Sequence, residues 1–342
     1  MTEPKDDIIA SGLDIGTMNI ILSMSNTNQF RTMRNVFLPV SEEEIDLSEL
    51  NDISYVRDDG GEIYILGQDA FTFCNIFGKK VNRPMESGLI SPKEISAIDV
   101  LTLMVKNLFG NQIKNKKVVC SYSIPAEAID EKRSVIYHEK VFGKILSSLG
   151  IEAAPINEAM AVIYSETAAE GFSGIGISFG AGLSNVALSY KGVEMLSFSM
   201  ARGGDWIDGN VGESLGIIPN RATNIKEKHL DLTNIKGVNK KTKRILEALS
   251  YYYNSLINYT IKKIISEFNE KVDTELDGPI PIVISGGTSL PNGFLEMFKK
   301  NMDKHDLPFG ISEIKRAKDP LTAVSNGLLV KTLSTIKKEK KK

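Results

Sequence analysis

Cysteine, an excess of one charge and long apolar stretches are all scarce in this chain. Its two cysteines, Cys74 and Cys120, lie in apolar segments and form no CxxC spacing, so the pattern offers no metal or redox motif and is typical of a reducing compartment. Lysine and arginine number 41 against 43 acidic residues. This balance gives no overall positive field, so we expect no nucleic acid among the partners.

Apolar runs are short throughout. Nowhere do about 18 apolar residues follow one another, as a membrane-spanning helix requires, and residues 1–7 are polar and acidic, unlike a secretory leader. We therefore expect a cytoplasmic protein. Its 342 residues exceed the usual size of one hydrophobic core, which predicts two lobes.

What the chain does contain is a pair of glycine-rich turns, each between two short apolar segments. Residues 8–13 and 20–24 flank Asp14-Ile-Gly-Thr-Met-Asn19, and residues 175–179 and 184–190 flank Gly180-Ala-Gly182. Each pattern predicts two strands joined by a tight turn. The two lobes are thus expected to repeat one hairpin.

Helical patterns alternate with further strands. Ser91-Pro-Lys-Glu94 has the pattern of a capping box, and apolar residues at helical spacing follow as far as Leu108. A long amphipathic helix is predicted over 243–270 and a terminal helix over 320–336. Strands are predicted over 117–123, 193–199 and 280–285. This alternation indicates the α/β class.

Glycine-rich turns of this kind suit phosphate, because backbone N–H groups converge where no Cβ blocks the approach. Asp14 would repel phosphate unless a divalent cation stood between them, so we expect it to hold Mg²⁺ through water. A third turn, Gly286-Gly287-Thr288, would let a flat base approach the backbone. An ordinary strand-to-helix turn is the alternative there.

In this order the segments resemble the nucleotide site shared by actin, the bacterial MreB and MamK filament proteins, sugar kinases and heat-shock chaperone ATPases. Leu13–Thr17 resembles the first phosphate segment, Gly176–Ser184 the second and Val283–Thr288 the adenosine segment; 121–126 and 319–328 resemble the two connecting segments. The resemblance implies a two-lobed actin-like fold, a duplicated ribonuclease H-like fold, with a nucleotide cleft between the lobes.

The resemblance also implies the lobe boundaries. Lobe I is expected to comprise 1–150 plus 320–336, with a small outer subdomain at about 32–82; lobe II to comprise 151–319, with a small outer subdomain at about 213–275; and a basic tail to follow at 337–342. We expect the tail to be a solvated end, and membrane contact to be possible only through it.

The likeness is greatest to the bacterial actins. Arg83–Ile90, Asn157–Ala161 and Gly204–Asp208 resemble stretches found there, and Ile225–Lys228 is similar to the actin stretch whose Lys-Glu pair contacts adenine and ribose. This implies that Lys226 packs on the base and that Glu227 accepts from the ribose hydroxyls.

The cofactors implied are ATP or ADP and Mg²⁺. The residues expected at the nucleotide are Asp14, Gly16, Thr17, Met18, Asn19, Gly180, Ala181, Gly182, Leu183, Ser184, Gly204, Asp205, Lys226, Glu227, Gly286, Gly287 and Thr288. The metal is expected at Asp14, through water, and at Ser178.

Two features depart from the superfamily pattern. The second phosphate segment normally carries an aspartate where this chain has Ser178, and a hydroxyl is a weaker partner for hydrated Mg²⁺, so we expect slow hydrolysis. The residue that orients the attacking water belongs on the stretch 130–139. An ungapped alignment places Lys132 there, and other registers offer Glu131, His138 or Glu139; we favour Glu139 with His138 beside it, and a solvated helix face is the alternative.

These observations predict a nucleotide-dependent filament subunit with itself as partner and a weak ATPase activity. A non-polymerising ATP-binding adaptor of the same fold is the first alternative, and the loss of the carboxylate at Ser178 favours it. A small-molecule kinase of the sugar type is the second, although no aspartate lies in a convincing motif for its base.

Overall fold

The computed structural model describes residues 8–41, 53–58, 60–76, 78–235, 238–273 and 276–339. The chain divides into two compact units. Unit 1 comprises Met1–Ile124, Ser134–Ile156 and Leu328–Lys342, and unit 2 comprises Pro125–Arg133 and Asn157–Gly327. Each unit is built on one five-stranded sheet.

The sheet of unit 1 contains both predicted strands of the first hairpin. Its order is β10 (Glu152–Asn157), β9 (Val118–Ile124), β1 (Ile9–Ile15), β2 (Asn19–Met24), β3 (Arg31–Arg34). The strands β1, β2 and β3 form an antiparallel meander, and β9 lies parallel to β1.

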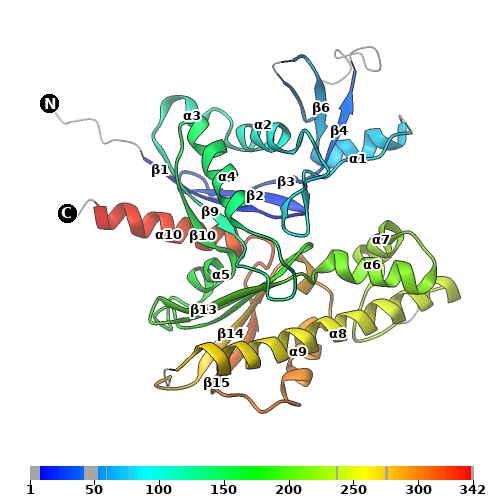
Figure 1. Ribbon diagram of the computed structural model, residues 1–342, viewed down its shortest axis with the longest axis vertical. Helices are drawn as coiled ribbons and strands as arrows, with labels where there is room; N and C mark the ends of the chain where they lie inside the picture. Colours follow the sequence, from blue (N-terminus) through cyan, green and yellow to red (C-terminus); the bar gives the residue numbers. More distant parts are fainter. Residues whose placement is uncertain are drawn as a thin grey trace. The chain divides into compact units, whose positions relative to one another are not determined.

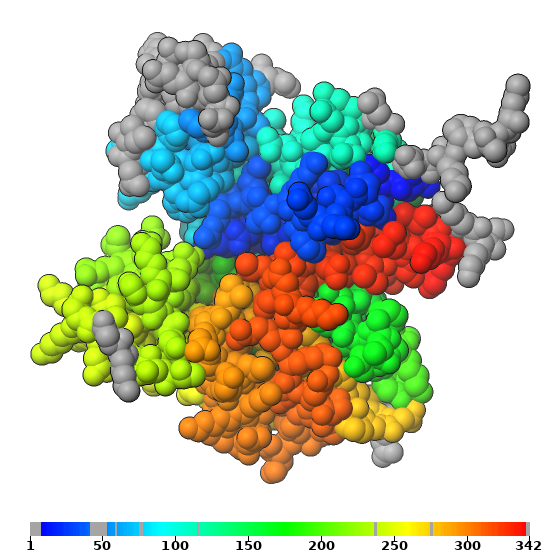
Figure 2. Space-filling model, turned by 180° about the vertical axis from the view of Figure 1, so that it is seen from behind, coloured from blue at the N-terminus to red at the C-terminus, as the bar shows by residue number. Residues whose placement is uncertain are grey.

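Side-chain alternation separates the two faces of this sheet. Leu13 and Tyr122 face a core shared with α2 (Ala97–Phe109) and α4 (Ile136–Ser148), whereas Asp14 and Ser123 are directed to the other face. Figure 1 shows α10 (Ala323–Glu339) on the face opposite α2. Figures 1 and 2 both show α10 beside the N-terminal strands, where Thr332 bonds to the backbone of Ser11.

A smaller part of unit 1 follows β3. It consists of the antiparallel strands β4 (Phe37–Val40), β6 (Ile63–Leu66) and β5 (Tyr55–Arg57), the helix α1 (Gly67–Ile76), and the hairpin of β7 (Met85–Glu86) and β8 (Leu89–Ile90). Val36, Leu38, Ile63 and Ile65 form its own buried cluster. Farther along the chain, the short helix α3 (Gln112–Asn115) precedes β9.

The sheet of unit 2 has the same strand arrangement as that of unit 1. Its order is β15 (Ile311–Arg316), β14 (Ile280–Ser285), β11 (Gly174–Phe179), β12 (Ser184–Tyr190), β13 (Val193–Met200). Here β11, β12 and β13 form the antiparallel meander and β14 lies parallel to β11. The repetition confirms the predicted duplicated α/β fold.

Helices α5 (Glu158–Glu166), α8 (Lys240–Lys271) and α9 (Phe294–Met302) cover the second sheet, and α6 (Gly204–Leu215) and α7 (Pro219–His229) pack against each other and against α8. Ile177 and Phe179 face the large core with α8 and α9. On the opposite face α5 lies so close to β11 that a Cβ on Gly176 would be 2.4 Å from the carbonyl oxygen of Ala159.

The predicted capping box at Ser91–Glu94 was wrong, because α2 begins only at Ala97. The amide of Ser91 donates to the carbonyl of Pro84, which closes the β7–β8 hairpin. Ser91 is therefore held by the strand pair and is not available to begin a helix, and Ile95 is left 98% exposed.

The other helices correspond closely to the prediction. The amphipathic pattern of 243–270 forms α8, capped by Asn239, whose side chain accepts from the amide of Thr242. The terminal helix α10 begins three residues later than predicted, at Ala323. Within the described ranges, no helix is long and apolar enough to cross a membrane.

Candidate functional site

The two predicted glycine turns close in the same way. In unit 1 the amide of Gly16 donates to the carbonyl of Asn19 at 2.9 Å, and in unit 2 the amide of Gly180 donates to the carbonyl of Leu183 at 2.9 Å. A Cβ on either glycine would lie 2.9 Å from that acceptor oxygen. Only glycine therefore permits this closure, in which the intervening residues turn sharply between two strands.

The first turn is held from two sides by the smaller part of unit 1. Asn35, fully buried ahead of β4, donates through its side chain to the carbonyl of Gly16 at 2.9 Å, and its amide donates to the carbonyl of Met18 at 2.9 Å. The hydroxyl of Thr17 accepts from the amide of Gly88, in the β7–β8 hairpin, at 2.9 Å. Thr17 and Met18 are thus fixed by tertiary contacts as well as by the turn.

Asp14 lies at the end of β1 beside this turn. Ser123 donates to its Oδ1 at 3.0 Å and accepts from the amide of Ile15 at 2.8 Å. Burial raises the pKa of Asp14 to about 7, although the bond from Ser123 acts in the opposite direction. A bound cation would favour the ionised form.

The donor set here suits a hydrated cation. Within the described ranges, no group of three or more His, Cys, Asp or Glu side chains gathers in a way that would enclose a metal ion. Mg²⁺ commonly retains several waters and uses one or two carboxylates together with phosphate oxygens. Asp14 fits that role, which stays a prediction.

Ser178 brings a residue to the site that the sequence analysis did not identify. Its hydroxyl donates to Oε1 of Glu158 at 2.6 Å, and the side chain of Asn185 donates to Oε2 of the same carboxylate at 3.0 Å. Glu158 is the first residue of α5, whose N-cap, Asn157, accepts from the amides of Ala159 and Met160. The positive end of the helix dipole favours a carboxylate there.

Ser178, one of the two departures from the superfamily pattern, thus shares one carboxylate with Asn185, because both bond to Glu158. Asn185 is itself held by a hydrogen bond from Ser199 on β13. The sequence did contain a signal, since Glu158 lies in the stretch that resembles the bacterial actins. Its position opposite Ser178 depends on the packing of α5 on β11.

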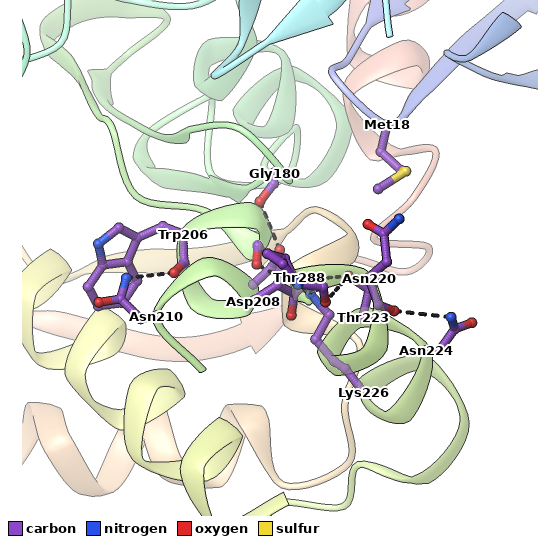
Figure 3. Close-up of polar contacts among 12 residues, drawn as sticks. Met18, Gly180, Trp206, Asp208, Asn210, Asn220, Thr223, Asn224, Lys226 and Thr288 are labelled. Carbon is purple, nitrogen blue, oxygen red and sulfur yellow. Dashed lines mark hydrogen bonds and ion pairs between the residues drawn. The ribbon is translucent and has the colours of Figure 1, made fainter. Parts of the chain in front are cut away.

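Three backbone segments of unit 2 meet at the second turn. The amides of Gly204 and Asp205, in the first turn of α6, donate to the carbonyls of Gly180 and Ala181 at 3.0 and 2.8 Å. The hydroxyl of Thr288, in the predicted adenosine turn, donates to the carbonyl of Gly180 at 2.8 Å (Figure 3).

Glycine is required for this approach. A Cβ on Gly286, which has φ of 89°, would lie 2.3 Å from the carbonyl oxygen of Phe179, and one on Gly203 would lie 2.4 Å from that of Ala181. The structure therefore brings together the predicted residues around Gly180, Gly204 and Thr288 within one unit.

Lys226, predicted to pack on a base, lies on α7 in a buried ion pair. Its Nζ is 2.6 Å from Oδ2 of Asp208 on α6 and 3.4 Å from the carbonyl oxygen of Gly204 (Figure 3). Burial raises the pKa of Asp208, while Lys226 acts to lower it. Glu227, the next residue on α7, is exposed.

The residues considered for orienting water differ in their surroundings. Glu139 and His138 lie in the first turn of α4 in unit 1. Glu131 precedes that helix, belongs to unit 2, and pairs with Nε of Arg133 at 2.7 Å. His138 is only 2% exposed and packs on the ring of Phe142, with centroids 4.8 Å apart. A catalytic role for Glu139, His138 or Glu131 stays a prediction.

A comparison with known proteins identifies the family. The family model described as Volactin matches residues 9–332, almost the whole length of the chain. The chain belongs to the Volactin family. No curated protein matches it.

Solved structures show which fold the Volactin-family chain shares. It is similar to the MamK double helical filament, with 18% identity over 94% of this chain and 98% of that chain and a TM-score of 0.69. It is also similar to MreB5 of Spiroplasma citri bound to ADP, with 16% identity over 98% and 99% and a TM-score of 0.66. A third is the ethanolamine utilization protein EutJ from Carboxydothermus hydrogenoformans, with 17% identity over 96% and 91% and a TM-score of 0.53.

These likenesses confirm the actin-like fold that the sequence segments predicted. At such low identity they show the fold alone. The candidate groups of this Volactin-family chain are the first glycine turn with Asp14 in unit 1, and the second glycine turn with Glu158 in unit 2.

Proposed function

We propose that this Volactin-family chain binds ATP and ADP with Mg²⁺ at its glycine turns and assembles into filaments in a nucleotide-dependent way. The observation that carries the proposal is the identical closure of two glycine turns at equivalent strand junctions, Gly16 to Asn19 and Gly180 to Leu183. Such turns direct backbone N–H groups at an anion. The similar MreB5 structure is bound to ADP, and the similar MamK structure is a filament; both support the proposal.

Each group of residues at the glycine turns would have its own role in nucleotide binding. Backbone groups of the two turns would contact phosphate oxygens, and Asp14 would hold Mg²⁺ through water, with its carboxylate oriented by the hydrogen bond from Ser123. Thr288 and the glycines around it keep the third turn close to the second. When Mg²⁺ is bound it neutralises the polyphosphate and the charge that develops in hydrolysis.

Filament assembly would couple to the nucleotide by a shift between conformations. A nucleotide favours the conformation that it binds more tightly, and longitudinal contacts add to that preference if they fit the same conformation. Hydrolysis or release then weakens the contacts. The partner is a second copy of this chain. We also propose a cytoplasmic location, which the cysteine pattern supports because its two cysteines are typical of a reducing compartment.

A pelleting experiment tests assembly. Purified protein is centrifuged with Mg-ATP, with Mg-ADP and without nucleotide, released phosphate is assayed, and the pellets are viewed by negative-stain electron microscopy. We expect filaments with Mg-ATP and little pellet without nucleotide.

The site is tested with charge reversal at Asp14. Asp14→Lys places an ammonium where the cation is held, so Mg-dependent ATP binding and pelleting should both disappear. Asp99→Lys makes the same change at an exposed position of α2 and should leave both intact. ATP binding that survives Asp14→Lys in a direct titration would contradict the site assignment.

A non-polymerising adaptor is the second candidate. The observation that favours it is Ser178, whose hydroxyl bonds to Glu158 and stands where the superfamily normally has a carboxylate. We expect the loss of that carboxylate to reduce turnover more than binding, because Mg²⁺ neutralises charge that develops during phosphoryl transfer. A chain that binds ATP, releases no phosphate and stays in the supernatant at all nucleotide conditions would establish the adaptor and exclude the filament.

A further inference from the structure

Unit 2 contains a buried ion pair that the phosphate chemistry does not use. The side chains of Asp208 and Lys226 are 3% and 13% exposed, and Nζ lies 2.6 Å from Oδ2. Within the described ranges, Oδ1 of Asp208 has no hydrogen-bond partner. Removing two charges from water is costly, so a buried ion pair adds little to the free energy of unfolding. We therefore ask which neighbouring groups this pair positions.

The pair also fixes the rotation of α7 against α6. Thr223 and Lys226, three residues apart on one face of α7, both bond to Oδ2 of Asp208, at 2.7 and 2.6 Å. Figure 3 shows the three side chains converging beside Gly180 and Thr288. One oxygen atom thus determines which face of α7 is presented to the turns.

Backbone contacts join the Asp208–Lys226 ion pair, which we call the latch, to the second phosphate turn. Nζ of Lys226 is 3.4 Å from the carbonyl oxygen of Gly204, whose amide donates to the carbonyl of Gly180. A Cβ on Gly204 would lie 2.8 Å from the hydroxyl oxygen of Thr288 and 3.4 Å from Nζ. The ammonium therefore lies against the same backbone that brings the second and third turns together.

We propose that Asp208 is a positioning residue for nucleoside recognition, which holds the ammonium of Lys226 away from the phosphates and fixes its aliphatic stem as a surface for the base. The inference rests on the proposed function. A lysine is a flexible point charge and, unless held, turns toward the nearest anion. With its charge satisfied by Asp208, its methylene groups are left to pack against a flat ring.

The inference separates two parts of the ligand. Binding of the base and ribose depends on Asp208, whereas binding of the phosphate chain does not. Dissociation constants for Mg-ATP, Mg-ADP and inorganic tripolyphosphate with Mg²⁺ are therefore measured by calorimetry on the full chain.

Asp208→Asn removes the charge and keeps the shape. We expect at least tenfold weaker binding of ATP and ADP, and unchanged or tighter binding of tripolyphosphate, because the released ammonium is then free to meet phosphate. Glu213→Gln, at an exposed carboxylate on the same helix, is the control and should change nothing.

Adding Lys226→Met to Asp208→Asn tests the positioning role directly. Methionine offers a similar stem without an ammonium, so ATP affinity should return to within about threefold of the wild type and tripolyphosphate affinity should return as well. The double variant also avoids a buried unpaired charge, which covers the case in which Asp208→Asn alone does not fold.

Two results would overturn the inference. ATP affinity unchanged in Asp208→Asn would show that the latch does not position the base-contacting residue. Equal losses of ATP and tripolyphosphate affinity, not recovered in the double variant, would show a structural role alone. If the wild type binds no nucleotide, the proposed function itself fails and the inference fails with it.

Discussion

Burial decides the charge of His138. Its ring is 2% exposed, and within the described ranges neither ring nitrogen has a hydrogen-bond partner. Burial lowers the pKa of His138 from 6.5 to about 4. Between those values the unfolded chain binds a proton that the folded chain does not, so the free energy of unfolding falls as the pH decreases from 6.5 toward 4.

The size of the expected loss in the free energy of unfolding follows from the pKa shift of His138. It amounts to about 2 kcal/mol at pH 5 and about 3 kcal/mol below pH 4. His138→Phe, which keeps a ring against Phe142, should remove this part of the pH dependence, whereas His229→Gln, at an exposed histidine, should retain it. Denaturant midpoints of the three proteins at pH 7 and pH 5 provide the measurement. Equal losses in all three would assign the dependence to other groups.

Some single residues of the site could be predicted from the sequence and others could not. Gly16 and Gly180 could be predicted, because each turn closes on a residue three positions away and a strand lies on either side of it. Glu158 and Asn35 contact residues about 20 positions distant. The role of Glu158 depends on the packing of a helix on a strand, and that of Asn35 on the contact of a loop with a turn. Neither contact can be predicted from local residue spacing.

Close approach of backbones governs the elements around the second turn. Gly286→Ala would place a Cβ 2.3 Å from the carbonyl oxygen of Phe179 at a φ of 89°, so the third turn must move away from β11. We expect a marked loss of stability in unit 2, of about 2 kcal/mol or more.

Gly209→Ala is the matched control, made in the interior of α6, where a Cβ meets nothing within 4 Å. Alanine is favoured over glycine in a helix, so the free energy of unfolding of this variant should rise by about 1 kcal/mol. Thermal unfolding of both variants measures the contrast. A Gly286→Ala protein as stable as the wild type would show that the turn can relax without strain.

Elements with a long periodic pattern were predictable, and their starts were not always so. The stripe of apolar residues in α8 and α2 is local information. The start of α2 depends on the bond from Ser91 to Pro84 across a hairpin, and a capping pattern in the sequence gives no sign of that competing partner.

At the scale of the whole molecule, residues from both ends of the chain meet in unit 1. Thr332 on α10 donates to the carbonyl of Ser11 at 2.9 Å, and accepts from the amide of Ser121 at 2.9 Å. This one hydroxyl therefore ties the terminal helix to β1 and β9. The sequence predicted each of the three elements, but the contact itself joins positions too distant for any local pattern.

Thr332→Val keeps the shape and leaves the buried amide of Ser121 without its acceptor. We expect a loss of about 1 to 3 kcal/mol, with faster amide hydrogen exchange in β1 and β9 and unchanged exchange in β11 and β14. Thr335→Val makes the same substitution at an exposed position of α10, where the hydroxyl donates to the carbonyl of Lys331. Equal exchange in the two variants would argue against the tie.

The interleaving of the chain sets an order on its synthesis. Every residue of unit 2 has been made once Gly327 is added, whereas unit 1 still lacks residues 328–342 at that moment. A ribosome therefore completes the second unit first, and β1 and β2 are made long before α10, the helix that lies beside them. During that interval the amide of Ser121 and the carbonyl of Ser11 lack the hydroxyl of Thr332, and the first sheet is without the helix that joins its strands.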